Sequence, residues 1–546
     1  MIKKLSKQYA PENATIEFFD NAAVFEVPAS EIKKVLNDLH GNKDFSLKLI
    51  TATDEREAHG CFKIWYIFGV PKENLFLIPF IQLKNTEEFP SITPSIHAAI
   101  NYERRIQTFF GLTPVGHPDP RRLILHENWP NGVFPLRKDF DWNKRPAEAK
   151  PGAESHETYK FQKVEGEGIY EIPVGPIHAG IIEPGHFRFS VAGEEIVLLE
   201  PKLGYTHKGS EKLFEMLPLA DKVRLSEKIS GDSSFSHSLA FCQALEQLSA
   251  TAVPKRARYL RVIFAELERL ANHFGDIGAM MLDTGFNFGG AHGARLREMI
   301  MQLHERLTGS RFLRGVNVIG GVTKDISGNE KEKLSDDLER IMKDFFEIMA
   351  VAENSVSLLN RLKATGALSR EIADDLGMMG VAGKAVGIAK DTRVDYPYAA
   401  YDELRPEKVV TEQTGDVCAR FRVRVQEAFA SIEILQQALR KMPEGAICGT
   451  GEHGLHAEPG KSGSGAPAEK ISFKKNAIAV GVVEGWRGEI VYFVTTDAHG
   501  NISRVVPRDP SFVNWAGVGE AGLGNVVPDF PLINKSFNMS YSGNDL

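Results

Sequence analysis

The sequence predicts an α+β N-terminal domain followed by a mainly α-helical bundle domain that also carries β-hairpins. Strand-like apolar runs dominate the first quarter of the chain, long helical periodicities follow residue 254, and a polar segment separates the two regions. The chain has 546 residues, which is more than one compact core usually holds, since domains average roughly 100–200 residues. Its composition, 42% hydrophobic and 25% charged, is that of a globular protein.

Residues 1–145 alternate between two kinds of local pattern. The runs Phe62–Gly69 and Leu75–Ile81 are rich in aromatic and β-branched residues, which favours strands, while residues 32–39 have the spacing of an amphipathic helix. We therefore predict a small α+β domain over residues 1–145. Residues 146–158 are polar, aperiodic and proline-bearing, and this predicts a solvated linker.

Residues 159–546 are predicted to form the second domain. A β-rich portion, residues 159–201, precedes a helix that begins near Pro254, because proline suits a first helical turn. The apolar positions of this helix share one face, and they are Leu260, Ile263, Phe264, Leu267, Ala271 and Phe274. Two further helices are predicted from Glu330 and over residues 421–439. Apolar stripes of this length are typical of a bundle core.

The C-terminal quarter of the second domain contains a predicted loop and a predicted hairpin. Residues 452–470 are rich in glycine and serine and cannot bury much apolar surface, so we expect a mobile loop there. Residues 477–484 and 489–495 are strand-like and flank a short glycine-containing turn, which predicts a β-hairpin.

Charge, apolar runs and cysteines exclude several classes of function. A net charge of −7 offers no basic surface for nucleic acid. No apolar stretch approaches the ~20 residues that cross a bilayer, and we find no secretion signal, so we expect a chain without a membrane span that stays inside the cell. The cysteines form no CxxC pair and are predicted to be buried thiols; they are Cys61, Cys242, Cys418 and Cys448. Two GxGxxG strings lack the strand–turn–helix setting of a dinucleotide site, and we do not infer NADH binding by this chain.

Three strings in the first domain resemble one known family. They are Glu103-Arg104 with Phe110-Gly111, the segment 116–122 (GHPDPRR), and the segment 135–140 (PLRKDF). Together they resemble the signature of the C subunit of bacterial NADH:quinone oxidoreductase. The resemblance implies a docking domain without a cofactor of its own, although Arg105 stands where that family usually has an acidic residue.

The second domain resembles a related family. Residues 175–188 (GPIHAGIIEPGHFR) and 205–212 (YTHKGSEK), with Arg487-Gly488-Glu489, look like segments of energy-converting NiFe hydrogenase large subunits and of the complex I D subunit. The whole chain thus resembles a fused C/D-type subunit of the complex I and group 4 NiFe hydrogenase superfamily, similar to the formate hydrogenlyase large subunit. The implied fold of the second domain is that of the NiFe hydrogenase large subunit.

The resemblance breaks at the metal ligands. Four cysteines hold nickel and iron in that family, and the corresponding positions here are Ser230, Ser233, Ser540 and Gly543. A serine hydroxyl stays protonated near neutral pH and glycine has no side chain, whereas such a centre needs thiolates. We therefore expect no metal ligands and no nickel in this chain.

The resemblance also implies which residues face a cavity. In the D subunit of complex I the equivalent cavity binds quinone, and His178 aligns with a histidine that contacts the quinone headgroup. The family's tyrosine is absent from the corresponding stretch, which runs from Asp221 to Leu225. We predict catalytic roles for His178, Asp221 and His237, and a bound quinone contacting His178, His186, Ser230, Ser233 and Ser540.

The predicted function is that of a subunit in a membrane-attached, complex I-like or hydrogenase-related oxidoreductase that couples electron transfer to ion translocation. We expect its partners to be an iron–sulfur small subunit, which carries the cluster, and antiporter-like membrane subunits. The chain would be peripheral, on the cytoplasmic side of the cell membrane, and would touch the membrane only through partners. Two alternatives stay open: a non-catalytic structural subunit of the same complex, and an active NiFe hydrogenase.

Overall fold

The computed structural model describes residues 2–42, 44–71, 73–144, 146–147, 159–179, 182–449 and 471–546. The predicted mobile loop 452–470 lies outside the described residues. The predicted linker 146–158 also lies outside them, apart from residues 146 and 147.

The N-terminal domain is built on a five-stranded sheet of order β1-β2-β5-β4-β3. Its strands are β1 (Ile16–Phe19), β2 (Ala22–Glu26), β3 (Ser46–Glu55), β4 (Cys61–Val70) and β5 (Leu75–Leu83). The sheet is antiparallel except where β2 pairs with β5. Helices α1 (Ile2–Tyr9), α2 (Ile32–His40), α3 (Arg56–His59) and α4 (Ile100–Phe110), with the short strands β6 (Glu88–Pro90) and β7 (Thr113–Val115), complete the domain. Both predicted strands and the predicted helix are confirmed.

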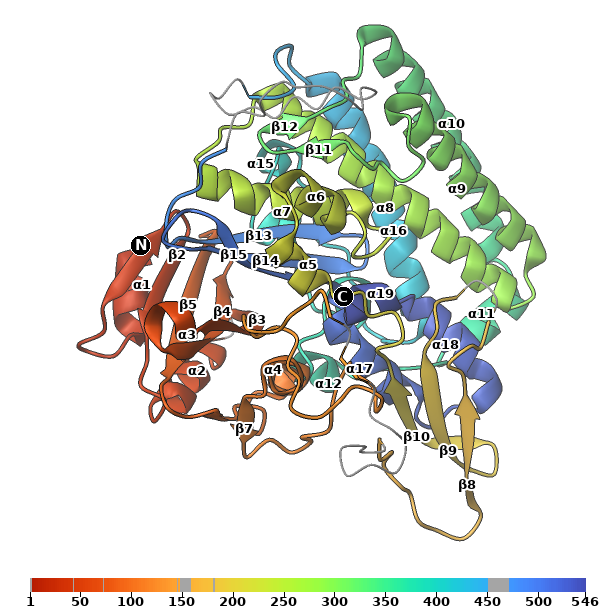
Figure 1. Ribbon diagram of the computed structural model, residues 1–546. Coiled ribbons are helices and arrows are strands. Elements are labelled where there is room, and N and C mark those ends of the chain that lie inside the picture. Colours follow the sequence, from red (N-terminus) through yellow and green to blue (C-terminus); the bar gives the residue numbers. More distant parts are fainter. Residues whose placement is uncertain are drawn as a thin grey trace.

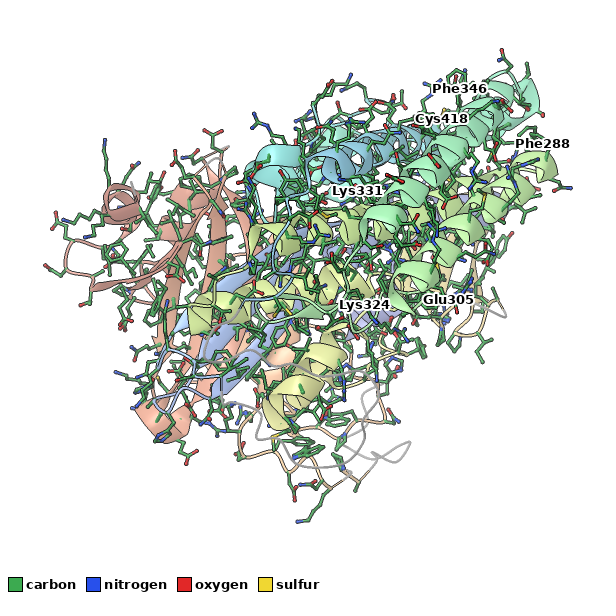
Figure 2. The ribbon with its side chains drawn as sticks, turned by 90° about the horizontal axis from the view of Figure 1, so that it is seen from above. Phe288, Glu305, Lys324, Lys331, Phe346 and Cys418 are labelled. Atoms are coloured by element: carbon green, nitrogen blue, oxygen red, sulfur yellow. The ribbon has the colours of Figure 1, made fainter. Side chains whose placement is uncertain are left out.

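Long helices form the bundle of the second domain. They are α8 (Lys255–Asp283), α9 (Asn287–Thr308), α10 (Gly328–Glu353) and α16 (Val417–Lys441). All three predicted helices are confirmed, and side chains cap the starts of two of them: the side chain of Ser327 accepts a hydrogen bond from the backbone of Glu330, and that of Asp416 from Ala419. Figure 2 shows α9 and α10 side by side, with Phe288 and Phe346 toward one end and Glu305 toward the other.

A second sheet joins the two domains. Its strands are β13 (Ile478–Gly485), β14 (Gly488–Thr496) and β15 (Ile502–Arg508), and β13 and β14 are the predicted hairpin. Alternate side chains of β14 enter different cores: Tyr492 packs with the helices, whereas Val491 and Phe493 pack with the N-terminal sheet. Both faces of this sheet are therefore buried, and in Figure 1 it lies between the red N-terminal strands and the green helices.

A third sheet, of order β10-β9-β8, lies at the side of the bundle. Its strands are β8 (Ile169–Val174), β9 (His186–Ala192) and β10 (Glu195–Lys202). The C-terminal helices α17 (Pro510–Gly522), α18 (Phe530–Phe537) and α19 (Tyr541–Asp545) pack beside it (Figure 1). The remaining elements are α5 (Ser210–Met216), α6 (Leu219–Ser226), α7 (Ser234–Ser249), β11 (Asn317–Val318), β12 (Gly321–Val322), α11 (Val356–Leu362), α12 (Arg370–Asp375), α13 (Gly380–Lys384), α14 (Thr392–Asp395) and α15 (Tyr401–Leu404), with 3-10 turns at His97–Ala99 and Val527–Asp529.

The structure also bears on the second GxGxxG string and on the expected lack of a membrane span. The second GxGxxG string, residues 517–522, lies inside α17 and does not open a helix after a strand, as expected for a chance match. Among the helices that the structure describes, none is both long and apolar enough to cross a membrane.

Candidate functional site

Ser230, Ser233 and Ser540 come together at the ends of two helices. Ser230 lies in the turn before α7, Ser233 is the residue that precedes α7, and Ser540 is the N-cap of α19. The hydroxyl oxygens of Ser230 and Ser540 lie 2.9 Å apart, although the residues are 310 positions apart in the chain. The side chain of Ser540 also accepts a hydrogen bond of 2.9 Å from the backbone N–H of Gly543. The structure thus brings the four positions that correspond to the family's metal ligands into one buried site.

An ion pair fills the space beside these serines. Both oxygens of Asp232 accept hydrogen bonds of 2.7 Å from the guanidinium of Arg487, which sits at the tip of the β13–β14 hairpin. Ser230 Oγ lies 2.8 Å from Asp232 Oδ1. Burial alone would raise the pKa of Asp232, but the charge of Arg487 lowers it, so the carboxylate stays ionised. The sequence analysis assigns neither residue a role in the site, because neither stands at a position of the family's metal ligands.

His237 supports this site from behind. Its Nε2 lies 3.0 Å from Asp509 Oδ2 and its Nδ1 lies 3.1 Å from the hydroxyl of Tyr492, with the ring fully buried. Burial raises the pKa of Asp509, and the hydrogen bond from His237 lowers it, with a net result of about 2. An ionised Asp509 fixes the proton on Nε2, which leaves Nδ1 to accept from Tyr492. Since both ring nitrogens are engaged, His237 positions Asp509.

A nickel–iron centre does not fit the residues present. The donor set consists of three hydroxyls and a glycine, and two of the hydroxyls bond to one another. A Cβ placed on Gly543 would lie 2.7 Å from Cγ of Asp509, so the carboxylate occupies the direction in which a ligand side chain would extend. Among the residues described, no group of three or more His, Cys, Asp or Glu side chains is arranged to hold a metal.

The contact at Gly543 gives a first prediction. We expect Gly543→Ala to lower the free energy of unfolding by about 1–3 kcal/mol, because its methyl group overlaps the Asp509 carboxylate. Gly231→Ala is the matched control, since its added Cβ would meet nothing nearer than the guanidinium of Arg314 at 3.6 Å. Urea unfolding of the wild type and both variants measures this. If both variants unfold with the same free energy, the overlap between the added methyl group at residue 543 and the Asp509 carboxylate is contradicted.

His178 meets a tyrosine that the sequence did not reveal. It lies in the turn between β8 and β9, and its Nε2 is 3.2 Å from the hydroxyl of Tyr541, the first residue of α19. Tyr541 is buried, with 4% of its surface exposed, and burial raises its pKa to about 12. Burial lowers the pKa of His178, so the imidazole is neutral near pH 7. The ring of Tyr541 fits only because residue 185 is glycine: a Cβ added there would lie 2.3 Å from Cε1 of the ring.

The other two predicted residues have different surroundings. His186 begins β9, with Nδ1 3.3 Å from the carbonyl of Gly175 and Nε2 3.4 Å from Nε of Arg188. It therefore holds the base of the hairpin that carries His178. Asp221 lies on α6, where its side chain is 45% exposed and forms an ion pair with Arg224 of the same helix. The contacts of the described residues do not link Asp221 to the serines.

Glu268 of α8 is a buried acid of this region to which the sequence analysis assigns no role. It extends from α8 to the first turn of α7 and accepts hydrogen bonds from the backbone N–H groups of Phe235 and Ser236, at 2.7 and 3.1 Å. Burial raises its pKa to about 7, with a smaller contribution from the charge of Asp232. A carboxyl that titrates near neutrality beside a site can give or take a proton.

This pKa gives a second prediction. Between about pH 4.5 and 7 the folded chain keeps a proton on Glu268 that the unfolded chain has released, so the free energy of unfolding falls as the pH rises through that window. The shift corresponds to about 3 kcal/mol. Urea unfolding at pH 5 and pH 8 should show this loss in the wild type and less of it in Glu268→Gln. The exposed Glu17→Gln variant should keep the wild-type profile, and an unchanged profile in Glu268→Gln would refute the assignment.

Comparison with known proteins agrees with this architecture. Residues 25–146 match the 30-kDa subunit family of respiratory-chain NADH dehydrogenase, and residues 283–545 match its 49-kDa subunit family. The chain is 32% identical to formate hydrogenlyase subunit 5 of Escherichia coli over 95% of its own length and 88% of that protein. It is 30% identical to the C/D subunit of NADH-quinone oxidoreductase from Phocaeicola vulgatus, over 77% and 83% of the two chains. Both subunit families match within this one chain, which places it in the class of fused oxidoreductase subunits.

The chain belongs to the complex I and group 4 NiFe hydrogenase large-subunit superfamily, in its fused C/D form. A chain in a solved structure of the membrane-bound sulfane sulfur reductase, an archaeal respiratory membrane complex, is similar in fold, with a TM-score of 0.63 and 25% identity, over 70% of this chain and 99% of that one. The predicted family and fold class are confirmed. The relatives are subunits of complex I-like and hydrogenase-related oxidoreductases, so the coarse function is confirmed as well.

Proposed function

We propose that this chain forms a quinone- or substrate-binding cavity in a membrane-attached oxidoreductase, beside an iron–sulfur partner subunit, and that reduction there drives ion translocation by antiporter-like membrane subunits. In this proposal the chain lies on the cytoplasmic side of the cell membrane and meets the membrane through its partners. No step involves nickel, because the four positions do not fit it.

The contact between His178 and Tyr541 carries the proposal. Reduction of a quinone places negative charge on its oxygens, and a phenol or imidazole N–H can donate a proton to them. Tyr541 remains protonated up to about pH 12, so it is a hydrogen donor at neutral pH. The pair lies next to Ser540, and Ser540 contacts Ser230. Polar donors therefore extend from the β8–β9 turn to the serine cluster.

A non-catalytic structural role is the second candidate. Asp232 and Arg487 are hydrogen-bonded to each other, as are Ser230 and Ser540, so these polar groups need no ligand to complete their hydrogen bonding. This favours a site that the protein's own side chains occupy. Substituting His178, Ser230 and Ser233 together distinguishes the two. Unchanged turnover of an intact complex would support the structural role.

The intact complex, purified with its partners, is the test of the proposed function. We expect electron transfer that depends on added quinone or on another small oxidised acceptor. Mass spectrometry of the purified complex should identify an iron–sulfur protein among its subunits. Electron transfer that is indifferent to every acceptor added to the intact complex would contradict the proposal.

A further inference from the structure

A chain of buried charged residues crosses the second domain toward the N-terminal sheet. The ammonium of Lys384, 1% exposed, lies 2.7 Å from carboxylate oxygens of both Asp391 and Glu427, and 3.3 Å from Glu484 Oε1. Glu427 in turn lies 2.9 Å from His273 Nε2. None of these groups takes part in the proposed quinone chemistry, and burial of so many charges needs an explanation.

Two of the carboxyl groups are opposite one another on the hairpin. Glu484, near the end of β13, pairs directly with Glu489, near the start of β14. Like charges directly opposite in a sheet repel, and this cost is higher where both groups are buried. Glu489 has close partners of its own: Arg508, at 2.6 Å, and Lys48 of the N-terminal sheet, at 2.5 Å. Within the described part of the chain, the Glu484 carboxylate contacts Lys384 at 3.3 Å, which is longer than the contacts of Lys384 with Asp391 and Glu427. It also accepts a hydrogen bond of 2.9 Å from the backbone N–H of Thr392.

The acids outnumber the bases in this layer. From within the protein, the carboxyl group of Glu484 is faced by Lys384 of α13, Asp391 and Arg393 at α14, Arg269 of α8 and the Tyr398 hydroxyl, and it shares Lys384 with Glu427 of α16. Among the described residues, the six carboxyl groups of the layer are Glu266, Asp391, Asp395, Glu427, Glu484 and Glu489, and the five lysine and arginine side chains are Lys48, Arg269, Lys384, Arg393 and Arg508. His273, which contacts Glu427, adds no fixed positive charge, because burial lowers its pKa. A net charge left in such a layer is costly, so one carboxyl group should keep a proton.

Water can reach Glu484 from one side. A cavity of about 100 Å³ lies between the N-terminal sheet and α13–α14, and both Glu484 and Glu489 line it. That volume holds several waters. The other charged groups that face it are His40, Lys48, Asp374, Lys390, Asp391 and Asp395. Burial, and then the charge of Asp391, raises the pKa of Glu484.

We propose that the carboxyl group of Glu484 is a proton-holding site, which takes one proton from water in this cavity and returns it there. Protonation converts the carboxylate into a neutral acid and removes its repulsion with Glu489 across the hairpin. The charge of Lys384 is then shared between Asp391 and Glu427 alone. Arg487, in the turn of the same hairpin, forms an ion pair with Asp232 beside the serine cluster. Glu484 therefore lies between the cavity and the serine cluster. This inference does not depend on the proposed quinone chemistry.

Infrared difference spectroscopy of the full chain tests this inference. Raising the pH should remove a carbonyl band of a protonated carboxylic acid from the wild type, and Glu484→Gln should lack one component of that band. Glu268→Gln and Asp395→Asn control for two other carboxyl groups whose pKa is raised, and both should keep the component assigned to Glu484. If the component survives in Glu484→Gln, or disappears in Asp395→Asn, the proposal fails.

Glu489→Gln provides an independent test if Glu484→Gln does not fold. This change removes the opposing carboxylate and leaves Lys48 and Arg508 without their partner, so both effects favour ionised Glu484. We expect the band to titrate at least about one pH unit lower than in the wild type. An unchanged or higher midpoint would overturn the proposal.

Discussion

Tyr541→Phe is expected to lower quinone-dependent turnover of the assembled complex by about 100-fold or more, since a positioned general acid contributes roughly 10²–10⁴ to a rate. The substitution removes only the hydroxyl that lies 3.2 Å from His178, and leaves the buried ring in place against Trp515. KM for the acceptor should change much less than kcat, because the donated proton matters most once charge develops on the acceptor.

A matched variant shows whether the loss is specific. Tyr170→Phe removes a hydroxyl from the neighbouring strand β8, where it donates to the carbonyl of Gly193 and the side chain is half exposed. We expect wild-type turnover from this control. Assembly of both complexes should be compared by size-exclusion chromatography. Full turnover in an assembled Tyr541→Phe complex would remove the main support for a catalytic cavity.

The fold was accessible from sequence because its determinants are local. The periodicity of α8, α10 and α16 and the apolar runs of β13 and β14, which are buried on both faces, follow directly from which side chains each element buries. The replacement of cysteine by serine at Ser230 and Ser233 was equally visible. Local patterns do not show which distant residue a side chain contacts. Tyr541, the hydrogen-bond partner of His178, lies 363 residues away in the chain.

Helix periodicity was also misleading about charge. Arg261, Glu268 and Arg269 lie on the face of α8 opposite its apolar stripe, a position that usually faces solvent. In the structure all three are buried, because the β13–β14 hairpin and α7 cover that face and supply partners. A single sequence records the charges but does not show that a second layer pairs with them. The proton-holding site proposed at Glu484 was hidden for the same reason.

Lys384→Met is expected to cause the largest loss of stability, about 3–5 kcal/mol, because it leaves buried carboxylates without their shared cation. Methionine has a similar volume, so the change tests charge more than packing. The ion pairs raise the pKa of Lys384 far above its ordinary value, so the wild-type lysine stays charged throughout the accessible pH range. Urea unfolding at pH 8 measures the loss.

The pH dependence of that loss separates electrostatics from packing. Without Lys384, Asp391 still pairs with Arg393, but Glu427 keeps only the hydrogen bond with His273. Glu427 can then become neutral only by taking up a proton, so the folded variant binds more protons than its unfolded form as the pH falls. The deficit relative to the wild type should therefore be smaller at pH 5 than at pH 8. Lys390→Met changes an exposed residue that lines the cavity beside Glu484, and it should change stability by no more than about 0.5 kcal/mol. A deficit in Lys384→Met that is constant with pH would mean that lost packing, and not unpaired charge, destabilises the chain.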